Sequence, residues 1–241
     1  GSLYPDRQID LAPASADASF RRYFRVHVDG EPASFIAMDA PPDKEDTAPF
    51  IRIAKLFGDS GAQVPTVLEA NTADGFLLLT DLGDTTYLNA LDADNAHALY
   101  ADALGALICI QKASAPGVLP DYDRERLRAE MQLFPDWYLA RHKHITLDDS
   151  EQKILDTVFE RLLEANLAEP KVFVHRDFHS RNLMVTEHGA GVLDFQDAVY
   201  GPITYDLASL FKDAYIDWDE AFVLDMLARY WDAARQVGLP V

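Results

Sequence analysis

The interval at which apolar residues recur changes near residue 92, and this change restricts the fold more than any other feature. Before it, the apolar runs are short and alternate with polar residues, as strands do. Segments 21–28 and 33–40 flank the turn Asp29-Gly30-Glu31-Pro32, which predicts a β-hairpin. The other elements expected in this part are a helix over 50–57 and strands over 64–70 and 75–82.

Beyond residue 92, apolar residues recur every three or four positions, which predicts helices. In one of these, Leu127, Met131, Phe134 and Tyr138 are expected to share a face. The remaining expectations are a helix over 150–166 capped by Ser150, strands at 172–174, 182–185 and 191–195, and helices near 204–215 and 219–237.

The predicted fold class is therefore α+β with two lobes. A small β-rich lobe over residues 1–80 is followed by a larger, mostly helical lobe over 81–241, and the joint lies at 77–84.

The charge and composition exclude several classes of protein. A net charge of −19 argues against nucleic acid as the partner, because binding to phosphate backbones needs basic surface. No apolar run approaches 18 residues, and the chain starts with a polar segment, so neither a membrane span nor a signal peptide is expected. The single cysteine, Cys109, cannot form an internal disulfide, which favours the cytoplasm.

Residues 174–182, VHRDFHSRN, place many polar groups directly after an apolar run. One interpretation is a zinc site, since His175 and His179 are four residues apart. Zinc proteases, however, need a glutamate after the first histidine, and Arg176 stands there. The other interpretation is the spacing His-Arg-Asp, four residues, Asn, which is typical of phosphotransferase catalytic loops. Asp177 then accepts the proton of an acceptor hydroxyl, and Asn182 binds Mg²⁺.

This pattern requires a second metal ligand at the end of a short hairpin, and Asp194 follows Asn182 by twelve residues. Each of these residues alone is common in turns. The joint spacing, however, favours phosphoryl transfer over a purely structural role.

These residues, together with Asp197 and the segment GPITYDLASL at 201–210, resemble the aminoglycoside phosphotransferase and choline kinase superfamily. Longer phrases such as ASFRRYFRV and LRAEMQLFPDWYL look like the bacterial anomeric sugar kinases acting on N-acetylmuramate and N-acetylglucosamine in peptidoglycan recycling. The resemblance implies a protein-kinase-like fold, ATP and Mg²⁺ as cofactors, and further helices beyond residue 241. It also implies that His175, Asp197 and Asp206 brace the catalytic loop.

The nucleotide-binding residues depart from the kinase pattern. The phosphate-covering loop falls at 15–20 and has no glycine, and Met38 stands where the strand lysine is expected. Alternation places Arg22 on the buried face of its strand, so Arg22 is the favoured phosphate anchor and Arg21 or Arg25 the alternatives. The resemblance implies that the backbone of Thr80, Asp81 and Leu82 contacts adenine.

The acceptor is expected to be an amino sugar, bound by Glu130, His179 and Arg181. The basic cluster Arg124, Arg126 and Arg128 is favoured as a solvated charged face, and its alternative role is to meet the lactyl carboxylate of muramate. Two alternatives stay open. One is a kinase for an aminoglycoside, choline or homoserine, and the other is a nucleotide-binding pseudokinase. The chain is expected to be a monomer.

Overall fold

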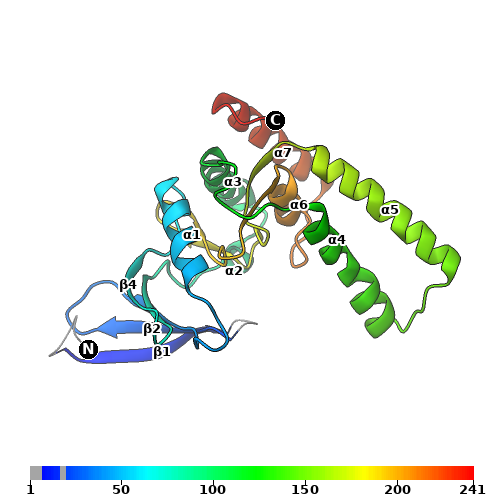
Figure 1. Ribbon diagram of the computed structural model, residues 1–241. Coiled ribbons are helices and arrows are strands. Elements are labelled where there is room, and N and C mark those ends of the chain that lie inside the picture. The colour runs from blue at the N-terminus through cyan, green and yellow to red at the C-terminus, as the bar shows by residue number, and fades with distance from the viewer. Residues whose placement is uncertain (1–6, 17–19) are drawn as a thin grey trace.

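The computed structural model describes residues 7–16 and 20–241. Within these residues, the N-terminal part forms a five-stranded antiparallel sheet of order β1-β2-β3-β5-β4 (Figure 1). The predicted hairpin, the helix near 50–57 and the two later strands are confirmed. The elements of this part are β1 (Ile9–Ala16), β2 (Arg22–Val28), β3 (Phe35–Asp39), α1 (Ala48–Asp59), β4 (Val67–Asn71) and β5 (Phe76–Thr80).

The sheet has one face directed into the core and one directed outward. Met38, Leu77 and Leu79 lie on the inner face and are buried in one apolar cluster with Phe57 of α1. Burial of each such side chain contributes about 2 kcal/mol. On the outer face, Phe76 remains 49% exposed. The inner face is therefore the one that can form a site together with the rest of the chain.

The second part is mostly helical, and two short antiparallel strand pairs, β6 with β9 and β7 with β8, lie within it. The predicted α+β class is thus confirmed. The elements of the second part are α2 (Tyr87–Ala90), α3 (Ala96–Lys112), α4 (Arg124–Leu133), η1 (Phe134–His142), α5 (Asp149–Ala168), β6 (Lys171–Val174), β7 (Leu183–Thr186), β8 (Gly189–Val192), β9 (Val199–Pro202), α6 (Tyr205–Phe211) and α7 (Glu220–Gln236).

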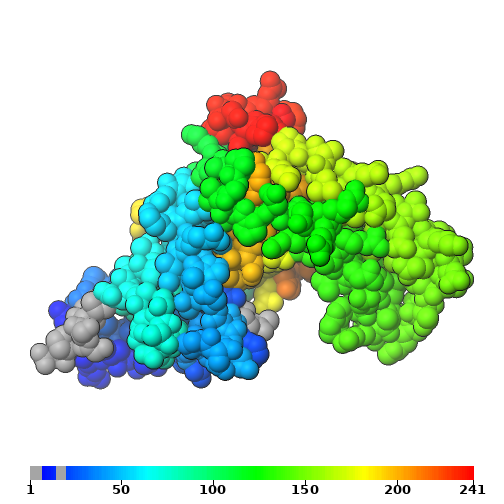
Figure 2. Space-filling view, in the orientation of Figure 1, coloured from blue at the N-terminus to red at the C-terminus, as the bar shows by residue number. Residues whose placement is uncertain are grey.

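The helices α4, η1 and α5 form an arm that projects away from the N-terminal sheet (Figure 1). The surface is hollowed between this arm and the sheet (Figure 2). The expectation that Phe134 and Tyr138 continue the buried face of Leu127 is wrong, because the helix widens to a π-helix at Phe134 and turns both side chains outward. The expected cap, Ser150, is also wrong. Asp148 caps α5 instead, in a capping box with Glu151.

The two parts are hydrogen-bonded to each other beyond their covalent connection. Gln63, between α1 and β4, accepts from Val192 N at 2.7 Å and contacts the Thr186 hydroxyl. Within the second part, Thr85, directly after the joint, accepts from Val185 N at 2.9 Å. The β7–β8 hairpin is therefore held from both sides.

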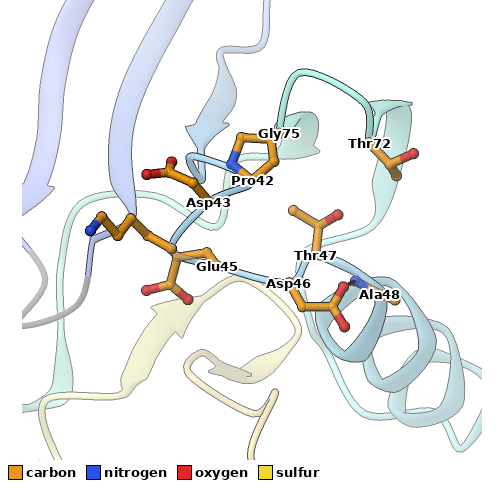
Figure 3. A pocket seen from close by; sticks show the side chains of 9 residues that line it. Pro42, Asp43, Glu45, Asp46, Thr47, Ala48, Thr72 and Gly75 are labelled. Carbon is orange, nitrogen blue, oxygen red and sulfur yellow. Dashed lines mark hydrogen bonds between the residues drawn. The ribbon is translucent and has the colours of Figure 1, made fainter.

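A cavity of about 660 Å³ lies between the loop of residues 42–48 and the turn before β5 (Figure 3). Three carboxylates, those of Asp43, Glu45 and Asp46, line it. None of the site residues predicted from the sequence lies on its wall. It therefore carries no chemistry that the sequence analysis requires.

Gly75, at the edge of this cavity, provides a test of the sheet. Its φ is +79°, its carbonyl accepts from Ala40 N at 2.9 Å, and a Cβ atom there would lie 1.9 Å from Ala40 O. We expect Gly75→Ala to lower the free energy of unfolding by about 2–3 kcal/mol, through left-handed strain and this clash. Chemical denaturation measures the loss.

Gly61→Ala is the matched control, because its φ is +92° and a Cβ atom there would meet nothing within 4 Å. Its free energy of unfolding should fall only by the cost of the left-handed conformation, about 1 kcal/mol. Equal losses in the two variants would contradict the predicted clash.

Among the described residues, no helix has both the length and the apolar content needed to span a bilayer.

Candidate active site

The polar stretch that follows β6 forms a loop fixed by a buried carboxylate. Asp206, at the start of α6, accepts from His175 N at 2.7 Å and from Arg176 N at 3.0 Å. Its side chain is fully buried, and burial raises the pKa of Asp206 to about 7. Arg176 has φ +84°, a conformation unusual for a non-glycine residue. These two hydrogen bonds hold the backbone in that strained form.

His175 connects the loop to the β7–β8 hairpin. Its Nε2 donates to Leu193 O at 2.8 Å, and its Nδ1 accepts from Asp177 N at 3.2 Å. Burial lowers the pKa of His175 to about 4, so the ring is neutral in this tautomer. Both ring nitrogens are used within the protein, which gives His175 a bracing geometry and leaves neither nitrogen for zinc.

Asp177, Asn182 and Asp194 lie together at the open side of the loop. Asn182 Nδ2 donates to Asp177 O at 3.0 Å and lies 3.5 Å from Asp194 Oδ2. Burial and the negative charge of Asp194 raise the pKa of Asp177. The residues predicted to accept a proton and to bind metal are thus brought to one place by β6 and the following hairpin.

A cavity of about 490 Å³ connects these side chains with the inner face of the sheet. Thr80, Asp81 and Leu82 lie on its wall, as do Tyr23 and Arg25 of β2. The backbone groups of Asp81 and Leu82 have no hydrogen-bond partner within the part of the chain that the structure describes. Free backbone groups beside apolar side chains can hold a planar, polar ring such as a purine.

The carboxylate of Asp81 is used internally. It accepts from Arg25 Nε at 2.6 Å, from Ser34 Oγ at 2.7 Å and from Gly83 N at 3.0 Å. Burial alone would raise the pKa of Asp81, but these hydrogen bonds outweigh it and lower the pKa. Arg25 also donates to Gly83 O at 2.7 Å, so this arginine fastens β2 to the joint.

The expectation that Arg22 lies on the buried face is wrong. Its side chain is 66% exposed on the outer face of the sheet, where it pairs with Asp39, and it does not line the cavity. Arg21 pairs with Glu45. Met38, at the lysine position, is buried in the core. The part of the expected phosphate-covering loop at residues 17–19 lies outside the described residues.

Glu130 is turned toward the protein rather than toward the cavity. It pairs with Arg176 Nη2 and accepts from the hydroxyls of Tyr122 and Tyr205. It is not on the cavity wall, so direct sugar binding by Glu130 is not what the structure supports. The ion pair instead fixes the Arg176 side chain.

Of the other residues predicted for the acceptor, His179 and Arg181 do line the cavity. Tyr215, which sequence reasoning missed, lies beside them. The Asp197 side chain contacts Gln196 Nε2 at 3.4 Å, and its carbonyl accepts from Arg176 Nη1 at 3.5 Å. Asp197 therefore touches the loop through its backbone and does not line the cavity.

The basic cluster is largely engaged on the arm. Arg124 pairs with Glu160, and Arg128 pairs with Asp156 and Glu160. Neither arginine lines the cavity. The exposed ion pairs of these two arginines agree with the favoured interpretation, a solvated charged face.

The donor set at the loop suits Mg²⁺. Asp194 offers a carboxylate and Asn182 an amide oxygen on the same wall, and Mg²⁺ is held in nucleotide sites by few protein oxygens plus phosphates. Among the described residues, no group of three or more His, Cys, Asp or Glu side chains is arranged to hold a metal ion by itself, without a nucleotide. The residues present thus fit an ion that is bound together with a nucleotide.

A small antiparallel sheet set against a helical lobe, with the cavity between them, is a protein-kinase-like fold. The chain belongs to the phosphotransferase enzyme family, whose model matches residues 10–238. The predicted family and fold class are confirmed.

Two curated relatives cover almost all of this chain. An N-acetylmuramate/N-acetylglucosamine kinase of Neisseria meningitidis serogroup B is 50% identical over 244 residues, which span 100% of this chain and 72% of the relative. A protein of the same name from Pseudomonas aeruginosa is 49% identical and spans 96% of this chain and 68% of the relative.

Solved structures similar to this fold include aminoglycoside phosphotransferases. The streptomycin–ATP ternary complex of APH(2'')-IIa has a TM-score of 0.65 at 17% identity and covers 98% of this chain and 83% of that chain. The ADP-bound APH(2'')-Ib has a TM-score of 0.63 at 16% identity, with the same two coverages. At these identities the likeness shows the fold alone.

Proposed function

We propose that the protein is an ATP- and Mg²⁺-dependent kinase that phosphorylates the anomeric hydroxyl of N-acetylmuramate and N-acetylglucosamine. The observation that carries this is the 50% identity, across the whole chain, to a kinase named for these two sugars. The 490 Å³ cavity supports it, because a carboxylate, a metal-type donor pair and free backbone groups line one wall. The role that follows is the reuse of cell-wall sugars in peptidoglycan recycling.

The residues divide the reaction among them. The backbone of Thr80, Asp81 and Leu82 binds the adenine. Asp177 accepts the proton of the anomeric hydroxyl. The oxygen of that hydroxyl bonds to the γ-phosphorus of ATP, and the bond between the γ-phosphorus and the bridging oxygen of the leaving ADP breaks. Catalysis then consists mainly of positioning and charge stabilisation.

Asn182 and Asp194 would hold Mg²⁺, which supplies charge neutralisation at the nucleotide phosphates. Their oxygens lie on the wall that also carries Asp177, so the phosphates and the acceptor hydroxyl meet at one place. His175, Asp206 and the Glu130–Arg176 ion pair keep the loop in register. Asp197 adds a carbonyl contact to Arg176. We assign these residues positioning roles.

We expect a cytoplasmic monomer that takes only small molecules, since a net charge of −19 disfavours nucleic acid. The lobes would divide near residues 80 and 81, where β5 ends and the joint begins.

The test is incubation with ATP, Mg²⁺ and each sugar, followed by ³¹P NMR. A sugar 1-phosphate signal is expected with both sugars, and chelation of Mg²⁺ should abolish it. Phosphorylation of an aminoglycoside, choline or homoserine, with neither sugar turned over, would replace the proposed acceptor. Nucleotide binding without transfer to any acceptor would favour the pseudokinase alternative.

A further inference from the structure

Tyr215 lies on the wall of the 490 Å³ cavity, although it comes from the connection between α6 and α7. Its hydroxyl accepts from Arg181 Nη1 at 3.1 Å, and the guanidinium carbon lies 5.1 Å from the ring centroid. The His179 ring packs edge-on against the Tyr215 ring, with the two centroids 5.8 Å apart. One aromatic and two basic side chains thus form a continuous wall beside Asp177.

The position of this wall is set by one carboxylate. Asp213 accepts from Ser180 N at 2.9 Å through Oδ2 and from Tyr215 N at 2.9 Å through Oδ1. Ser180 directly precedes Arg181 in the catalytic loop. Asp213 therefore clamps the α6–α7 connection to the loop and holds Tyr215 next to Arg181 by backbone contacts.

Arg181 differs from the other arginine of the cavity. Arg25 is paired with Asp81, whereas Arg181 forms no ion pair with a carboxylate among the residues that the structure describes. Four carboxylates line the cavity, those of Asp81, Asp84, Asp177 and Asp194. An anionic acceptor entering such a cavity needs a compensating cation, and an unpaired guanidinium is suited to a carboxylate.

The two proposed acceptors differ in their charge. N-acetylmuramate carries a lactyl carboxylate, and N-acetylglucosamine has a hydroxyl in its place. We propose that Arg181, oriented by Tyr215, binds the carboxylate of acidic sugar acceptors and sets the preference between the acidic and the neutral sugar. This inference rests on the proposed function and assigns a specificity residue within it.

The test compares kcat/KM for the two sugars in wild type and Arg181→Gln. We expect the ratio of N-acetylmuramate to N-acetylglucosamine to fall about tenfold or more, because a charge-assisted hydrogen bond is lost with one acceptor only. Arg181→Lys keeps the charge without the planar fork and should restore part of the ratio. Arg229→Gln, which removes an exposed arginine paired with Asp225 on α7, is the matched control and should leave the ratio unchanged.

The outcomes are separable. A ratio that stays constant in Arg181→Gln, while its melting temperature matches wild type, would overturn the inference. An equal loss with both sugars and a raised KM for ATP would also overturn it, by assigning Arg181 to the nucleotide phosphates. Wild-type turnover of neither sugar would overturn the proposed function together with this inference. A fall confined to the acidic sugar would support both.

Discussion

Asp177→Asn is expected to lower kcat about 10³-fold while the protein stays folded. The substitution keeps the shape of the side chain but removes the group that accepts the proton of the acceptor hydroxyl, and general-base catalysis typically contributes 10²–10⁴-fold. The backbone contacts of Asp177, to His175 Nδ1 and Asn182 Nδ2, do not depend on its carboxylate. Steady-state kinetics with saturating ATP measure the loss.

Asp232→Asn is the control for this change, because it removes an equal charge from an exposed position on α7. It should keep kcat within about twofold of wild type, as expected for a surface change remote from the cavity. Near-wild-type turnover by Asp177→Asn, in protein with an unchanged melting temperature, would remove Asp177 from the mechanism. ATP binding by this variant should persist, since Asp177 is not among the residues assigned to adenine or metal.

Asp206→Ala is expected to lower the free energy of unfolding by about 4 kcal/mol, the largest stability effect of the changes considered. It leaves the N–H groups of His175 and Arg176 buried without an acceptor, and each such group costs about 1–3 kcal/mol. Because the strained Arg176 backbone loses its support, turnover should fall as well. Urea denaturation at fixed pH gives the stability change.

The pH dependence of this loss has a definite sign. The pKa of Asp206 is raised to about 7 in the folded state, so its stabilising contribution is complete below its ordinary pKa of 3.8 and is lost as the pH rises through 7. The difference in the free energy of unfolding between wild type and Asp206→Ala should therefore be larger at pH 5 than at pH 8. Asp219→Ala, which removes an exposed helix cap, should cost about 1 kcal/mol. A gap that widens toward pH 8 would contradict the raised pKa.

Much of the site followed from local spacing alone. Asp177, Asn182 and Asp194 come together because one short strand and one hairpin fix the distances along the chain. Arg22 shows where such reasoning fails. Counting alternate residues separates the two faces of a strand, but it cannot say which face the rest of the protein covers.

The side-chain networks could not be predicted in the same way. Glu130 joins Arg176, 46 residues away along the chain, and Tyr205. Tyr215 reaches the cavity only because Asp213 holds its connection against the loop. The contacts of Glu130 and the position of Tyr215 both depend on packing between segments that are distant in the sequence. No local sequence pattern encodes this packing. A tyrosine in a polar connection between two helices gave no signal of its own.

The hydrogen bonds of the β7–β8 hairpin have a mechanical consequence. Val192 N donates to Gln63 O in the N-terminal part, and Val185 N donates to Thr85 O after the joint. Rotation of one lobe against the other would break the Val192–Gln63 hydrogen bond. The hydrogen of the Val192 amide should exchange with solvent only when the two lobes separate from each other.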